Sequence, residues 1–105
     1  MKRFACHRLY VSPGECYAKG VAELENDGRV RACFRLEEEI SATQWIGGVI
    51  VLSSEESLER EKGETFQAFV QRVLERVEGT VYAWHIADFD WVREEFTSQS
   101  KPVRL

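Results

Sequence analysis

The chain has 105 residues, of which 44% are hydrophobic and 30% are charged, and its formal net charge at pH 7 is −4. This size and composition predict one folded domain and exclude a disordered or fibrous protein. The acidic balance argues against a nucleic-acid-binding protein, since phosphate contacts need a basic face. We also expect no membrane protein, because no apolar run reaches the roughly 18 residues that a membrane-spanning helix needs.

The number of cysteines and the start of the chain bear on the cellular compartment of the protein. Cys6, Cys16 and Cys33 are an odd number, and the start of the chain is a poor signal peptide because His7 and Arg8 interrupt its apolar run. Cysteines in a chain without an export signal are typically reduced thiols rather than a disulfide framework. We therefore expect a cytoplasmic protein.

Alternating side chains predict the first strands. Residues 3–11 alternate as in a strand and end in the turn Ser12-Pro13-Gly14, where proline fixes φ and glycine tolerates positive φ. Residues 16–24 and 30–36 show the same alternation of apolar and polar side chains. These two runs are expected to pair as a hairpin.

The loop Asn26-Asp27-Gly28 sets the register of that hairpin. A three-residue loop with Gly28 in the left-handed conformation places Leu24 opposite Val30, so that apolar side chains share a face. A two-residue loop would instead place core residues opposite charged ones. The preferred register predicts two further pairs: Ala22 with Ala32, and Gly20 with Phe34.

The most apolar strand is predicted over residues 43–52, where Ile46 and the run Val49–Leu52 leave no polar face. Such a strand is typical of the middle of a sheet that is covered on both sides. Gly47-Gly48 interrupts it and indicates a bulge or a close backbone approach, which is also where a ligand or another chain could come near.

The main helix is predicted over about residues 65–78, because apolar side chains from Phe66 to Val77 recur at helical spacing. Thr65 or Gly63 is expected near its start, and Gly79 is expected to end it.

Residues 80–87 then predict a strand with two apolar faces, one of them carrying Tyr82, Trp84 and Ile86. Two apolar faces need two covers, of which one is the main helix and the other is a second sheet layer or a partner subunit. Asp88 follows as the expected N-cap of a short last helix that sets Phe89, Val92 and Phe96 on one side.

Together these elements predict an α+β fold. An antiparallel sheet of about five strands carries the main helix, at about 65–78, and a short C-terminal helix. One domain is expected over residues 1–97, with a flexible tail over residues 98–105.

A family resemblance rests on two segments, Gly20-Val21-Ala22-Glu23-Leu24 followed by Asn26-Asp27-Gly28-Arg29-Val30, and the later run Gly47–Leu52. Residues 9–52 resemble the small accessory β-domain of amidohydrolase-type metal-dependent hydrolases. In that family the last strand leads through a Pro-Gly turn to a His-x-His pair that binds metal, whereas Ser53-Ser54-Glu55-Glu56 follows here. The resemblance therefore implies a free-standing relative of the accessory sheet, with no hydrolase activity to carry over.

Thiol and imidazole groups suggest two kinds of reactive site. Zinc prefers such ligands, and the candidates are Cys6, His7, Cys16, Cys33 and His85. Their spacing matches no zinc pattern, and neighbouring Cys6 and His7 point to opposite faces of a strand. We therefore interpret the cysteines as packing residues and expect no metal and no cofactor. A nucleophile and base pair of Cys33 with His85 stays open, although the sequence marks no orienting third group.

Carboxylates offer a third possibility. Glu37-Glu38-Glu39, Asp88 and Asp90 supply paired acids for acid–base chemistry. Acidic runs are most often solvated turns and helix starts, and Asp88 is already explained as an N-cap. We therefore predict no catalytic residue.

Aromatic residues beyond the needs of one core indicate a pocket or an interface. The candidate ligand-binding or interface residues are Trp45, Tyr82, Trp84, His85 and Glu38. The main hypothesis is a noncatalytic binding or assembly module that self-associates, as a homo-oligomer or with a protein partner, and binds neither nucleic acid nor membrane. The alternative is a small enzyme or small-molecule-binding protein with a pocket around His85, Trp84 and Glu38.

Overall fold

The computed structural model describes residues 1–38 and 42–105, which form two β-sheets and one α-helix. Sheet A has four strands in the order β5-β4-β1-β6, and sheet B has five in the order β3-β2-β7-β8-β9. The strands are Lys2–Ala5 (β1), Arg8–Ser12 (β2), Glu15–Ala18 (β3), Gly20–Leu24 (β4), Val30–Arg35 (β5), Thr43–Trp45 (β6), Val49–Ser53 (β7), Tyr82–Ala87 (β8) and Lys101–Arg104 (β9). The helix α1 spans Phe66–Glu75.

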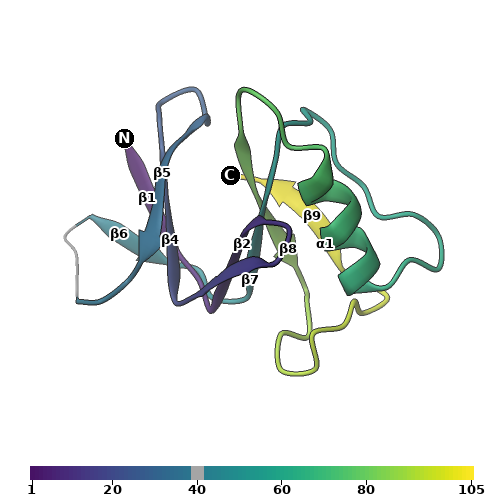
Figure 1. Cartoon of the computed structure of the whole chain (residues 1–105). Coiled ribbons are helices and arrows are strands. Elements are labelled where there is room, and N and C mark those ends of the chain that lie inside the picture. The colour runs from purple at the N-terminus through teal and green to yellow at the C-terminus, as the bar shows by residue number, and fades with distance from the viewer. Residues whose placement is uncertain (39–41) are drawn as a thin grey trace.

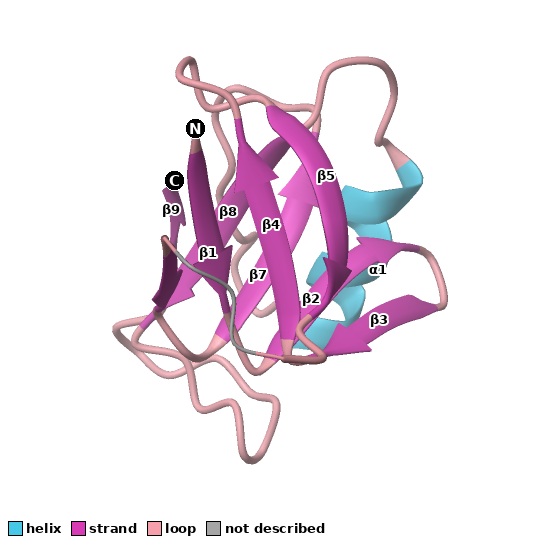
Figure 2. Cartoon of the chain, turned by 90° about the vertical axis from the view of Figure 1, so that its left-hand side faces the viewer, coloured by secondary structure: helices cyan, strands magenta, loops and turns pink. Residues whose placement is uncertain are grey.

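The layers follow from these elements. In Figure 1, sheet A lies to the left, β7 and β8 of sheet B lie in the middle, and α1 lies to the right. Figure 2 shows β1, β4 and β5 crossing in front of β7 and β8, with α1 behind them. Sheet B is therefore the middle layer, and the second cover of β8 is sheet A.

Three short connections join a strand of one sheet directly to a strand of the other. β1 continues into β2 through Cys6-His7, β3 continues into β4 through Lys19, and β6 continues into β7 through residues 46–48. The chain bends at these places, as the positive φ values of Lys19 (53°), Gly47 (67°) and Gly48 (64°) show. The two sheets are thus one bent sheet folded over a shared core.

The predicted antiparallel sheet of about five strands with two helices is wrong. Each sheet is mixed, since β1 pairs in parallel with β6, and β2 pairs in parallel with β7. Side-chain alternation could not reveal this, because its period of two is the same in straight and bent strands and in both pairing directions.

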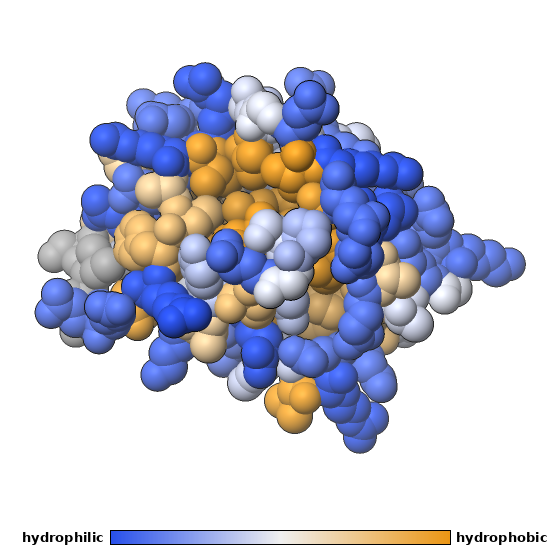
Figure 3. All heavy atoms as spheres, in the orientation of Figure 1, coloured by the Kyte–Doolittle hydropathy of each residue, from blue (hydrophilic) through white to orange (hydrophobic). Residues whose placement is uncertain are grey.

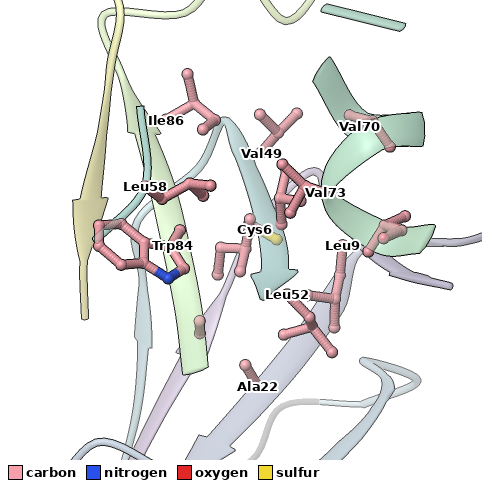
Figure 4. Close-up of a cluster of buried hydrophobic side chains, with 14 of the residues drawn as sticks. Cys6, Leu9, Ala22, Val49, Leu52, Leu58, Val70, Val73, Trp84 and Ile86 are labelled. Carbon is pink, nitrogen blue, oxygen red and sulfur yellow. The ribbon is translucent and has the colours of Figure 1, made fainter. Parts of the chain in front are cut away.

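The core lies on both faces of sheet B. All five residues of β7 are buried, as the sequence predicts for a strand with two covers. Five apolar residues of α1 are also buried: Phe66, Phe69, Val70, Val73 and Leu74. Figure 4 shows α1, β7, β8 and the bend at Cys6 contributing to one buried cluster. In Figure 3, hydrophilic side chains lie over α1 and apolar surface shows between the sheets.

The helix matches its prediction closely. The Thr65 side chain accepts a hydrogen bond from the Ala68 amide at 3.2 Å, which makes Thr65 the N-cap. The helix ends earlier than predicted, with Arg76 as C-cap. No helix within the described ranges is long and apolar enough to cross a membrane.

The predicted hairpin forms between β4 and β5, but its register is only partly confirmed. Gly28 has a φ of 91°, and Leu24 lies opposite Val30 as predicted. A bulge then shifts the pairing, so that Ala22 lies opposite Cys33 and Gly20 opposite Arg35. The predicted pairs of Ala22 with Ala32 and Gly20 with Phe34 are therefore wrong, because a bulge adds one residue to one strand.

The C-terminal region also differs from its prediction. Asp88 has a φ of 55°, whereas an N-cap residue needs extended backbone, so turns follow it in place of a helix. The Asp88 carbonyl instead accepts hydrogen bonds from the hydroxyls of Thr97 and Ser100, each at 2.7 Å. Residues 101–104 of the predicted tail form β9 and pair with β8.

Candidate functional site

The structure does not gather the predicted site residues into one pocket. Trp84 and His85 are neighbours in β8, so their side chains point to opposite faces of sheet B. Trp84 is only 6% exposed, and its Nε1 is buried without a hydrogen-bond partner in the described residues. Tyr82 carries the Arg104 guanidinium over its ring at 4.0 Å, and Glu38 is exposed in the loop after β5.

Of the candidate carboxylates, those within the described residues show no paired acid site. Glu37 and Glu38 are exposed, and Glu39 lies outside the described residues. Asp90 accepts a hydrogen bond from the Arg93 amide at 3.2 Å, which is a local turn contact.

The glycine bend, Gly47-Gly48, brings the two histidines of the chain close to one backbone segment. The Gly48 amide donates to Nδ1 of His7 at 2.8 Å. On the other side, burial lowers the pKa of His85, although a hydrogen bond with the Gly47 backbone opposes that shift. Gly48 has a φ of 64°, which favours glycine, and a Cβ atom built on it would lie 3.2 Å from Nε2 of His85. Both imidazoles therefore brace the bend.

His7 also belongs to an aromatic stack with Trp45 and Trp91. Its ring lies flat on Trp91, with centroids 3.9 Å apart and planes 12° apart, and meets Trp45 edge-on at 5.0 Å. Trp45 is 50% exposed and lies on β6, the last strand of sheet A. Among the aromatic residues predicted for the site, Trp45 is the one that is exposed.

The thiols are poorly suited to catalysis. Burial raises the pKa of Cys6 to about 12 and that of Cys33 to about 11. Burial also raises the pKa of Cys16, although the neighbouring Arg8 and Tyr10 side chains lower it. A nucleophilic cysteine needs the opposite shift. Among the described residues, no three metal-ligating side chains of the His, Cys, Asp and Glu types are grouped for a metal ion.

A groove runs along the first half of α1. One hollow of about 740 Å³ is lined by residues 60–67 and 94–96, and a second of about 390 Å³ extends toward β2 and β3. Phe66, Gln67 and Glu94 line both hollows. The second hollow is completed by Arg8, Tyr10, Cys16, Val70 and Gln71. We call the two hollows together the α1 groove.

The apolar floor of the α1 groove is an aromatic cluster. The Phe66 ring contacts Tyr10 at 5.3 Å, Phe89 at 4.4 Å and Phe96 at 5.6 Å between centroids. The loop after β8, which lies below α1 in Figure 1, supplies Phe89 and Phe96. Phe89 and Phe96 therefore fix this loop against the start of the helix.

Charged groups of the α1 groove meet at Glu94. Its Oε1 lies 3.2 Å from Nε of Arg8 and accepts a hydrogen bond from the Tyr10 hydroxyl at 3.4 Å. The Arg8 contact is an ion pair without good alignment, because the buried Nε makes no hydrogen bond in the described residues. Glu94 has a φ of 54°, a left-handed conformation that costs a non-glycine residue about 1–3 kcal/mol. The loop thus holds a strained residue with its carboxylate beside Arg8.

Sequence reasoning missed this groove because its polar residues come from β2, β3, α1 and the loop after β8. One signal was present: Arg8 and Tyr10 are two residues apart in a strand and share a face, which places a charge beside an aromatic ring on the side of β2 opposite the buried Leu9.

No protein-family model, curated protein or solved structure matches the chain. The resemblance of residues 9–52 to the accessory β-domain of amidohydrolase-type hydrolases therefore stays a prediction.

Proposed function

We propose that this protein is a noncatalytic binding module that holds a small molecule with an apolar body in the α1 groove. The observation that carries the proposal is the meeting of two hollows, of about 740 Å³ and 390 Å³, over the floor at Phe66. Small-molecule sites typically occupy about 300–1,000 Å³ and combine an apolar lining with a few polar groups. Each of the two hollows has this size, and Phe66, Tyr10 and Phe96 supply the apolar part of a lining that is otherwise largely charged and polar.

The chemistry of the side chains supports a noncatalytic role. The thiols resist ionisation, and His7 and His85 are engaged with the backbone of the glycine bend. The three cysteines are free, which supports the cytoplasm as the compartment.

The proposal is tested with phenylnaphthylamine, an uncharged aromatic dye, in an NMR titration of the labelled protein. The side-chain amides of Gln67 and Gln71 line the groove, while those of Gln44 and Gln99 serve as internal controls. We expect saturable shifts of the Gln67 and Gln71 signals, with the two controls unmoved. Uniform weak shifts of all four signals would refute the proposal.

A matched pair of variants sharpens this test. Gln67→Trp places a large ring in both hollows, whereas Ala68→Trp adds the same ring at an exposed neighbouring position of α1 that lines neither. We expect Gln67→Trp to weaken dye binding at least tenfold, which corresponds to about 1.4 kcal/mol. Equal effects of the two variants would contradict the proposed location.

Self-association is the second candidate function, and the exposed Trp45 favours it. Trp45 is half exposed on β6, whose outer edge is the end of sheet A. An edge strand can pair with the same strand of a second copy, and aromatic residues are enriched at such interfaces. The proposed occupant is therefore a second copy of this chain.

Light scattering after size exclusion tests self-association. We expect a dimer that Trp45→Gln converts to a monomer, while Val92→Gln, at a position 78% exposed in the loop after β8, leaves it intact. A wild-type monomer at high concentration would remove this candidate.

A further inference from the structure

The Arg8 guanidinium lies in the α1 groove, and not all of its N–H groups have a hydrogen-bond partner in the described residues. Its side chain is 42% exposed and lies in the second hollow, where the buried Nε has a carboxylate at 3.2 Å but no hydrogen bond in the described residues. Arg60, in the first hollow, is already committed: its Nη2 donates to the Thr97 carbonyl at 3.0 Å, and its guanidinium lies 4.7 Å from the centre of the Phe96 ring. Of the two arginines that line the α1 groove, Arg8 is therefore the one expected to receive an incoming anion.

Glu94 occupies the position that such an anion would take. It sits in a short loop closed by two backbone hydrogen bonds between Asp90 and Glu95, of 3.2 Å and 3.1 Å. From this loop its carboxylate reaches both Arg8 and the Tyr10 hydroxyl. The side chain is 37% exposed, so it can turn toward solvent while the loop stays closed.

We propose that the α1 groove selects small organic acids, whose anionic group replaces the Glu94 carboxylate at Arg8 and Tyr10 while their apolar body lies along the groove. This inference rests on the proposed function of the groove and adds the class of ligand. A planar guanidinium pairs two of its N–H groups with one carboxylate or sulfonate, which a poorly aligned loop carboxylate does not achieve. Arg8 thus acts as the specificity-determining residue, and Glu94 as an internal competitor.

Two dyes separate this inference from the proposed function. Anilinonaphthalene sulfonate and phenylnaphthylamine share the same aromatic body and differ in the sulfonate group. We expect the wild-type protein to bind the sulfonate at least tenfold more tightly than the neutral dye. If neither dye moves the Gln67 and Gln71 signals, the proposed function and this inference both fail. If the neutral dye binds there and the sulfonate binds no more tightly, only this inference is overturned.

Variants of Arg8 and Glu94 test whether these two residues cause the preference for the sulfonate dye. Arg8→Gln is expected to weaken sulfonate binding at least tenfold and to weaken binding of the neutral dye by a clearly smaller factor. Lys101→Gln removes one positive charge on β9 and serves as the charge-matched control, with no change expected. Glu94→Gln is expected to strengthen sulfonate binding several-fold, because it removes the competing charge. Equal losses of both dyes in Arg8→Gln, or weaker sulfonate binding in Glu94→Gln, would overturn the inference.

Discussion

Replacing Gly20 with alanine tests how closely the two sheets pack. Gly20 begins β4, and a Cβ atom built on it would lie 2.3 Å from the Cβ and 3.0 Å from the Cδ2 of Leu9. Carbon atoms in contact prefer about 3.5–4.0 Å, so the backbones must separate by more than about 1 Å. The Cβ of Leu9 is fixed to its backbone and cannot rotate away.

We expect Gly20→Ala to lower the free energy of unfolding by about 3 kcal/mol, at the upper end of the range for an overpacked core. Gly20 does not have a positive φ, so backbone strain adds nothing to this cost. The effect is therefore a measure of packing alone.

Urea unfolding followed by circular dichroism measures this change, and the slope m reports whether the denatured state has changed as well. Gly14→Ala is the control, because Gly14 has a φ of 80° and nothing within 4 Å of a built Cβ. The Gly14→Ala change should lower the free energy of unfolding by about 1 kcal/mol through backbone strain alone. A Gly20→Ala protein as stable as the Gly14→Ala protein would refute the close approach of the two sheets.

Other predictions use the same unfolding assay. Thr65→Ala removes the N-cap of α1 and should lower the free energy of unfolding by about 1 kcal/mol, whereas Thr65→Asn should keep most of the stability that the cap supplies. Trp84→Phe should cost less than about 2 kcal/mol, because removing the unpaired Nε1–H offsets part of the lost packing; a larger loss would mean that this group is paired. The folded state keeps the Cys6 thiol protonated up to a pKa of about 12 while the unfolded thiol ionises near 9.0, so Cys6 should contribute about 1.4 kcal/mol per pH unit to a fall in stability above pH 9.0, in addition to the contributions of Cys16 and Cys33, and a flat profile would contradict the burial of Cys6. His85, with its lowered pKa, takes up its proton more readily in the unfolded chain, so stability should also fall as pH drops below 6.5, less steeply in His85→Gln.

The local elements were predictable where one physical signal dominated. The apolar stripe and the Thr65 cap define α1, and the uninterrupted apolar run Val49–Leu52 identifies the fully buried β7. The turns that replace the predicted short helix after Asp88 were not predictable, because hydrogen bonds from the Thr97 and Ser100 hydroxyls to the Asp88 carbonyl hold that segment, and no sequence spacing indicates them.

The arrangement of the sheets and the groove was not predictable for a different reason. Both depend on contacts between segments far apart in the chain, such as the parallel pairing of β2 with β7 and the approach of Glu94 to Arg8. Alternation places Arg8 and Tyr10 on one face of a strand, but it does not say which loop will lie above that face. His85 and Trp84 do not share a face of sheet B, since adjacent strand residues point apart.

The glycine bend and the α1 groove are connected through the start of β2. The Gly48 carbonyl accepts hydrogen bonds from the amides of both His7 and Arg8, at 3.0 Å and 3.3 Å, so the bend fixes the direction in which β2 leaves it. Because Arg8 is the first residue of β2, that direction also decides where its guanidinium enters the groove. His7 and His85, which brace the bend from its two sides, therefore influence the groove without lining it. Mutations of these histidines should alter ligand affinity by moving Arg8, and should not be interpreted as evidence of catalysis.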